Sequence, residues 1–185
     1  MSEDVIDRLA GIAPGSALSA VREVRAVARV QAQASYDALF APVEVADMGL
    51  EERFVVAAFV AGLHRDTVVA NFYGAGAGGL AALVAAEAVE GRAVGPYGAF
   101  PAGVLSREDV AGPVYRAGAV GGRMGAALAH AHMLVFHPRD AGAGDLQALL
   151  DAGWSTTGIV TLSQLVSFLA FQIRVVAGLR VMNAK

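Results

Sequence analysis

The chain of 185 residues is 56% hydrophobic and only 17% charged, with a formal net charge of −3 and no cysteine. This length favours one domain with a single well-buried core. The acidic balance and the scattered arginines exclude nucleic-acid binding, because no basic stripe is present. So few charged residues cannot cover a monomer of this size, which favours a homo-oligomer with apolar faces between its subunits.

The N-terminal residues are acidic and lack the positive start and apolar run of a signal peptide. Without cysteine there is no disulfide framework, so we expect a cytoplasmic protein. The uncharged stretch 152–173 reaches the ~20 residues that a membrane-spanning helix needs. Its many Ser, Thr and Gln residues favour a buried bundle helix instead, and we expect no membrane association.

Helix signals dominate the first half of the chain. Apolar residues recur at three- and four-residue steps over 16–40, which predicts an amphipathic helix or a broken pair that ends near Pro42. Acidic residues in the segment 47–52 predict the start of a helix that runs to about Leu63.

The next segments alternate between helix and loop. Asp66 or a neighbour is expected to cap a helix through Tyr73, and the alanine-rich segment 80–90 predicts another helix. Between 74 and 79 the glycines match G-x-G-x-x-G, but no convincing second strand accompanies them, so we favour a turn over a dinucleotide site. The Pro/Gly-rich segment 91–113 is expected to be an irregular, functional or mobile loop.

The second half is also expected to be helical. We predict helices over 124–136, 145–151 and 156–182, the last of them apolar nearly all round and therefore buried in a bundle or an interface. His130 and His132 lie on opposite sides of their helix and cannot share a metal, whereas His130 and His137 share a face. With no carboxylate at a helpful spacing, we interpret all three as surface or interface histidines and expect no metal and no cofactor.

The segment from Gly49-Leu50-Glu51-Glu52 to Asn71 resembles the core motif of the alkylhydroperoxidase D and carboxymuconolactone decarboxylase superfamily. The peroxidase motif of that superfamily reads Glu, eleven residues, Cys, two residues, Cys, three residues, His. Counted from Glu52, its positions fall on His64, Thr67 and Asn71. Residues 123–182 are similar to the closing helices of peroxidase-related members. The resemblance implies an all-α, alkylhydroperoxidase-D-like helical bundle.

The resemblance divides the single domain 1–185 into an N-terminal helical arm (1–44), the family core helices (45–90), the Pro/Gly-rich loop (91–113) and the C-terminal helices (114–185). Only Glu52 matches the motif residue for residue. Without sulfur there is no peroxidatic nucleophile and no disulfide to turn over, so thiol peroxidase activity is excluded for this chain acting alone.

The replaced positions are still polar. His64, Thr67 and Asn71 follow i, i+3, i+7 spacing on one helix face, and we expect Glu52 to approach them from the preceding helix. A histidine beside a carboxylate can act as a base near neutral pH, which predicts a small-molecule pocket with acid–base residues. Two alternatives stay open: the four side chains only satisfy one another, or the chain is a non-catalytic partner of a cysteine-bearing paralogue.

Overall fold

The computed structural model describes residues 4–45 and 47–184, and all regular structure in these residues is helical. The α-helices are, in chain order, α1 (Val5–Ala10), α2 (Ala17–Glu23), α3 (Ala26–Phe40), α4 (Leu50–Leu63), α5 (Thr67–Gly74), α6 (Ala81–Glu90), α7 (Gly122–Phe136), α8 (Ala143–Asp151) and α9 (Thr156–Asn183). Two short 3-10 helices, η1 (Gly78–Leu80) and η2 (Val104–Glu108), lie in the connections. The expectation of an all-α protein is confirmed.

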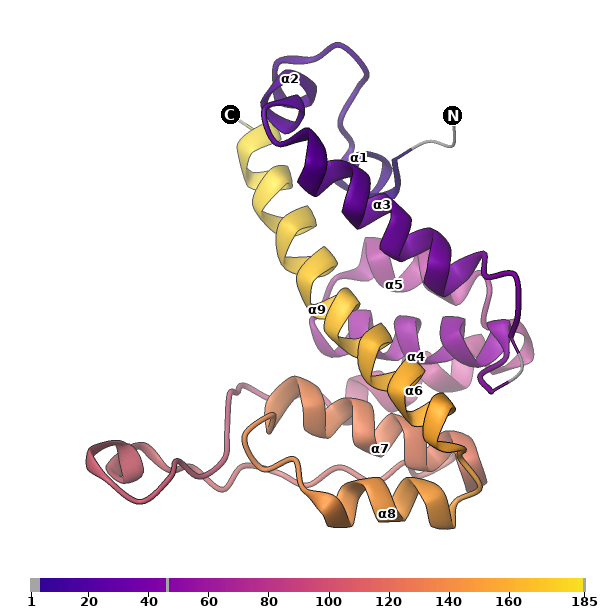
Figure 1. The fold of residues 1–185 in the computed structure, drawn as a ribbon, viewed down its shortest axis with the longest axis vertical. Coiled ribbons are helices and arrows are strands. Elements are labelled where there is room, and N and C mark those ends of the chain that lie inside the picture. Colours follow the sequence, from indigo (N-terminus) through magenta and orange to yellow (C-terminus); the bar gives the residue numbers. More distant parts are fainter. Residues whose placement is uncertain (1–3, 46, 185) are drawn as a thin grey trace.

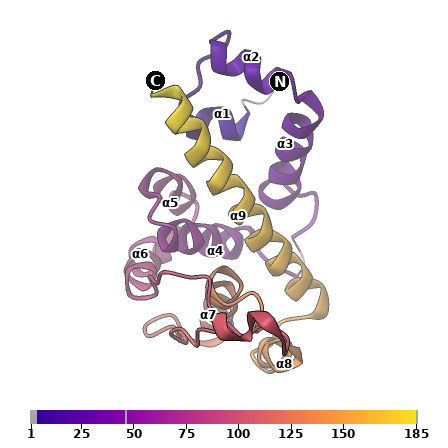
Figure 2. The ribbon, with the colours of Figure 1, turned by 90° about the vertical axis from the view of Figure 1, so that its left-hand side faces the viewer.

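The helices lie in three groups along the molecule (Figures 1 and 2). Helices α1–α3 form one end, α4–α6 the middle, and α7 and α8 the other end, while α9 runs past all three groups. Helix α9 packs on α1, α2, α3, α4, α7 and α8, which makes it the common support of the bundle. The core is densest at α4, where Val55, Val56, Phe59 and Val60 are fully buried. Each such side chain stabilises the fold by about 1.5–3 kcal/mol.

Local hydrogen bonds set the starts of α4 and α5 at the positions that the sequence predicts. Glu52 accepts a hydrogen bond from the backbone N–H of Gly49 at 2.9 Å and closes the first turn of α4. Asp66 caps α5 by accepting from the N–H of Val69 at 3.0 Å. Both contacts satisfy donors that a helix start leaves free.

Helices α4 and α6 approach very closely at Gly62. A Cβ atom at this position would lie 2.6 Å from the Cβ of Ala88, so the packing of these two helices requires glycine here. The alanine-rich composition of α6 therefore serves a close helix contact in addition to helix propensity. The glycine run 74–79 ends α5 and leads into η1, and no strand precedes it in the described chain.

The N-terminal region holds one element that we did not expect and one that we did. Helix α1 is capped by Asp4, whose carboxylate accepts from the N–H of Asp7 at 2.9 Å. The segment 16–40 is the broken pair, α2 and α3, that was one of the two expectations. Arg22 and Arg29 from this pair bridge to the carboxylates of Asp4 and Asp7 and hold α1 in place.

The Pro/Gly-rich connection between α6 and α7 is longer than the expected 91–113 and extends to residue 121. Part of it leaves the helices as a narrow arm, seen at the side of the molecule in Figure 1. The two sides of the arm pair once, between Gly98 and Val110, and η2 lies near its tip. Its returning side, through Val114 and Tyr115, lies against α7 and forms part of the pocket described below.

Helix α9 is long and apolar enough to cross a membrane by length and composition, a test that core helices of soluble proteins also pass. Half of its most apolar window is buried against the other helices. Of the two environments expected for this helix, the centre of a bundle does not apply on all sides, because Val160, Gln164, Ser167 and Phe171 are exposed, and burial in an interface stays a prediction. One side of α9 packs on the bundle, and the other side is a surface without charge over this stretch.

Candidate functional site

The expected contact between Glu52 and His64 does not form. Both residues belong to the same helix: Glu52 lies in the first turn of α4 and His64 is its C-terminal cap. At 1.5 Å per residue, the twelve-residue separation places them about 18 Å apart along the helix axis. The expected helix to about Leu63 forms as α4, and this helix keeps Glu52 in its first turn away from His64 at its end.

Glu52 instead forms an ion pair with Arg123 at the start of α7. Arg123 donates from Nε to Oε1 at 2.9 Å and from Nη2 to Oε2 at 3.2 Å, a bidentate arrangement. The same guanidinium lies 3.8 Å from the centroid of the Trp154 ring, and the indole N–H of Trp154 donates to the Arg123 carbonyl at 2.9 Å. Glu52 thereby ties α4 to α7 and to the turn before α9, which is a structural contact.

Of the other three predicted residues, Thr67 and Asn71 lie together and His64 lies apart from them. Thr67 and Asn71 are exposed residues of α5 and line a groove whose other walls are mostly alanine. His64 precedes α5 and is not among the residues that line this groove. Its Nε2 atom is buried without a hydrogen-bond partner. Burial, followed by the charge of Arg174, lowers the pKa of His64 and outweighs the opposite effect of Asp66.

The three histidines of the α7 region are buried, which corrects their interpretation as surface or interface residues. His130, His132 and His137 are 6%, 2% and 6% exposed. All three border one pocket of about 290 Å³ between α7, α8 and the returning side of the arm. Sequence patterns do not outline this pocket as a whole, because its walls come from three segments that meet only in the fold.

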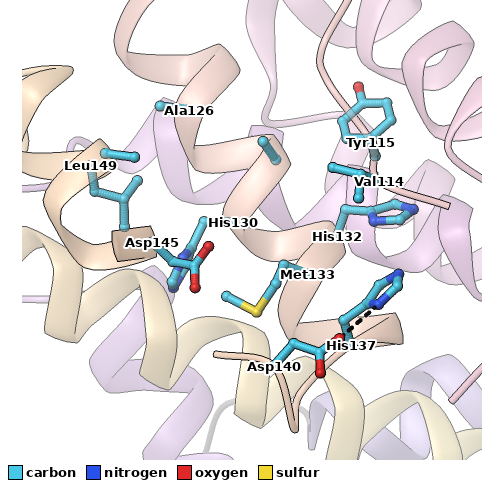
Figure 3. A pocket seen from close by; sticks show the side chains of 12 residues that line it. Val114, Tyr115, Ala126, His130, His132, Met133, His137, Asp140, Asp145 and Leu149 are labelled. Carbon is cyan, nitrogen blue, oxygen red and sulfur yellow. Dashed lines mark hydrogen bonds and ion pairs between the residues drawn. The ribbon is translucent and has the colours of Figure 1, made fainter. Parts of the chain in front are cut away.

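The pocket has an apolar floor and a polar rim (Figure 3). Helices α7 and α8 run antiparallel, and α7 contributes Ala126, Ala129, His130 and Met133, which follow helical spacing on one face. Leu149 of α8 and Tyr115 of the arm complete the apolar wall. Two carboxylates, Asp140 and Asp145, also line the pocket, so the expectation that no carboxylate lies near these histidines is wrong.

His132 and His137 have hydrogen-bond partners that fix their rings. His132 donates from Nε2 to the carbonyl of Gly91 at 2.9 Å and stacks on Tyr115, with ring centroids 5.0 Å apart. His137 donates from Nε2 to the carbonyl of Pro113 at 2.8 Å, and its Nδ1 lies 3.3 Å from Asp140 Oδ2. Both histidines therefore hold the arm against α7.

His130 is different, because neither of its ring nitrogens has a partner although both are buried. Buried polar atoms are almost always hydrogen-bonded, and leaving one unpaired costs about 1–3 kcal/mol. Burial lowers the pKa of His130 and outweighs the opposing effect of the nearby Asp145. At neutral pH the ring is therefore neutral, with one nitrogen able to accept a hydrogen bond or a proton and the other able to donate.

The wall behind Tyr115 is reinforced by a buried carboxylate. Glu87 of α6 accepts hydrogen bonds from the Tyr115 hydroxyl and from the backbone N–H groups of Ala119 and Val120. Burial opposes its ionisation, but these hydrogen bonds dominate and hold the pKa of Glu87 below its usual value. Burial, with the neighbouring Glu87 as a further cause, raises the pKa of Tyr115. The phenol thus stays protonated and keeps its ring at the pocket wall.

No family model matches this chain, and no curated protein matches it. Function therefore has to be inferred from the site itself. Among residues 4–45 and 47–184, no group of three or more His, Asp or Glu side chains has a geometry that could hold a metal ion. One sequence signal did point to the pocket: Asp140 follows His137 by three residues, within reach of a side chain at the end of a helix.

Proposed function

We propose that this protein binds a small organic molecule in the pocket between α7 and α8, with His130 as the polar group that recognises it. The observation that carries this proposal is the pair of unpartnered, buried ring nitrogens on a histidine that lines a pocket. A fold that needed His130 only for packing is better served by an apolar side chain of the same shape. A ligand that supplies the missing hydrogen bonds accounts for the histidine.

Acid–base chemistry is the reaction class that this site supports. The lowered pKa of His130 keeps a nitrogen lone pair available at neutral pH, and the adjacent Asp145 carboxylate stabilises the imidazolium that forms when the ring accepts a proton. Thiol chemistry is excluded because the chain has no cysteine. The acid–base function inferred from the sequence is thus retained, with His130 in place of His64.

The test compares two histidines of similar environment. His130 and His64 both have a buried, unpartnered nitrogen and a lowered pKa, but only His130 lines the pocket. Small fragments are screened against the full chain by protein-detected NMR, and binding is repeated with His130→Phe and His64→Phe. We expect fragments that shift α7 and α8 resonances to lose affinity at least tenfold in His130→Phe and less than twofold in His64→Phe. The reverse pattern would favour a site around His64.

We further propose that the bundle is of the alkylhydroperoxidase-D-like type. Support comes from α4, which begins just before Glu52, and from α5, which begins at Thr67. The second motif cysteine would therefore stand at a helix start, where the helix dipole favours a thiolate. This chain keeps the helix boundary at that position and lacks the sulfur.

Self-association through α9 is a second proposal, with a second copy of this chain as the partner. One row of exposed residues on α9 follows alternating four- and three-residue steps, at Val160, Gln164, Ser167, Phe171, Arg174, Gly178 and Val181, and further exposed residues lie at both ends of the helix. This is the spacing with which identical helices pack along a seam. Beside it, Leu146 and Leu150 of α8 extend the apolar surface. Co-purification with a cysteine-bearing homologue, in place of a homo-oligomer, would identify the chain as a partner subunit.

A further inference from the structure

The charges around the α7–α8 pocket are of one sign. Among the described residues that line it, Asp140 and Asp145 are the only ones with a fixed charge, and no Lys or Arg is present. His130 is neutral because its pKa is lowered. Asp140 already faces His137 and lies near Arg139, whereas no ion pair of the described residues involves Asp145. Asp145 is therefore the carboxylate that would repel an anionic ligand and attract a cationic one.

Asp140 and Asp145 differ in how many of their hydrogen-bond acceptor positions are still free. Asp140 accepts from the N–H of Ala99 at 3.0 Å through Oδ1 and faces His137 through Oδ2. Asp145 accepts from the N–H of Gly142 at 2.9 Å through Oδ2. Within residues 4–45 and 47–184, no ion pair involves Asp145. Since a carboxylate offers about four acceptor positions, Asp145 is the group with capacity for a ligand cation.

Asp145 and His130 face the same hollow, and Figure 3 shows the carboxylate beside the imidazole ring with Met133 next to them. Solvent does not reach the ring nitrogens, so a ligand contacts them after a rotation of the ring or of the half-buried Asp145 side chain. An ammonium group has several N–H donors and can bond Asp145 and the unprotonated nitrogen of His130 together. Neither a neutral alcohol nor a carboxylate can satisfy both acceptors in this way.

Resting on the proposed function, we infer that the ligand of this pocket is a small primary amine. Its protonated nitrogen lies between Asp145 and His130, and its hydrocarbon part lies on Ala129, Met133 and Leu149. The pocket volume of about 290 Å³ is at the lower end of the range of about 300–1,000 Å³ for small-molecule sites, which restricts the ligand to a compact molecule.

The test uses three probes of nearly equal size with different head groups: benzylamine, benzyl alcohol and benzoate. Binding to the full chain is measured by calorimetry at neutral pH, with NMR shifts to locate each probe. We expect benzylamine to bind at least tenfold more tightly than benzyl alcohol, and benzoate to bind most weakly. The Asp145→Asn variant keeps an oxygen that can cap α8, so it tests the charge and not the fold.

Asp145→Asn should weaken benzylamine at least tenfold and leave benzyl alcohol within twofold. Asp151→Asn is the matched control, because Asp151 lies on the same helix, is exposed, and accepts from Gln147 outside the pocket. It should leave both probes within twofold. Equal binding of the three probes in the pocket would overturn the amine inference while the pocket function stands. Failure of every probe to shift α7 and α8 resonances would overturn both proposals.

Discussion

Replacing His130 by Phe should stabilise the folded protein while it removes ligand binding. The histidine is 6% exposed and leaves two ring nitrogens unpaired. Each unpaired buried polar atom costs about 1–3 kcal/mol, and a Phe ring of similar shape carries no such cost. The two penalties are not additive, so we expect a gain of about 1–3 kcal/mol at neutral pH. For a chain of this length, each kcal/mol raises Tm by roughly 2–4 °C.

The pH dependence of the free energy of unfolding tests the same prediction independently. The pKa of His130 is lower in the folded protein than the ordinary value of 6.5, so below that pH the unfolded chain binds more protons than the folded one. Stability is therefore fully present above pH 6.5 and falls as the pH decreases toward the folded pKa. Each such histidine contributes a slope of up to about 1.4 kcal/mol per pH unit. Because half of the unfolded histidine is still neutral at pH 6.5, the advantage of His130→Phe over the parent should grow by up to about 1 kcal/mol between pH 6.5 and 5.5.

The control is His132→Phe, in the same helix and with a pKa that burial also lowers. His132 donates to the Gly91 carbonyl, so its loss leaves that buried acceptor unpaired and should destabilise the protein by about 1–3 kcal/mol at pH 7.5. Each variant loses the pH slope of its own histidine, and both slopes have the same sign, but the effects of the two variants at pH 7.5 have opposite signs. Urea unfolding at pH 5.5, 6.5 and 7.5 measures both quantities. A His130→Phe variant that is less stable than the parent at pH 7.5, or that keeps the parent slope, would refute the reasoning.

Three further predictions follow from the remaining contacts. Glu52→Gln should leave the NMR titration of His64 unchanged, because the two residues lie about 18 Å apart along α4. A lower pKa of His64 in this variant would show that Glu52 and His64 interact, as expected from the sequence. Gly62→Val should lower stability by about 1–3 kcal/mol in urea unfolding, because its Cβ would lie 2.6 Å from that of Ala88; an unchanged midpoint would contradict this close packing. Phe171→Glu should reduce the mass measured by light scattering to that of an 18.9 kDa monomer, and a parent that is already monomeric would refute the α9 seam.

Helix positions could be predicted from the sequence because the deciding interactions are local. Asp66 caps α5 through a residue three positions further on, and Glu52 closes α4 in the same way. Such contacts depend on spacing along the chain, which a sequence displays directly. The same holds for the end of α7, where Pro138 follows the last helical turn.

The partners of the polar residues could not be predicted, because they are distant in sequence. Glu52 pairs with Arg123, 71 residues away, and no periodic pattern links the two. The interpretation of Glu52 and His64 as neighbours came from the order of residues in a family motif, and this order does not give the distance between them. The expected helix to about Leu63 forms as α4 and places the two residues near its opposite ends.

For the histidines of α7, the helix face could be predicted from the sequence, but the burial of that face could not. Helical spacing correctly separated His130 from His132, but whether a face is buried depends on what covers it. Here α8 covers the His130 side and the arm covers the His132 side, and neither segment carries a sequence signal for that placement. The Pro/Gly-rich segment 91–113 was expected to be an irregular, functional or mobile loop. The connection continues beyond it and places Tyr115 at the pocket wall, where Glu87 accepts a hydrogen bond from the Tyr115 hydroxyl.

The energetic difference between His130 and its neighbours is the strongest reason to expect a ligand. His132, His137, Glu87 and Asp140 all have partners, so the fold satisfies polar groups throughout this region with one exception. An unpaired histidine in an otherwise satisfied network lowers stability without helping to hold the helices together. Proteins retain such destabilising groups at sites where a bound molecule supplies the missing partner. The amine that we propose between Asp145 and His130 supplies one here, and its positive charge faces the Asp145 carboxylate.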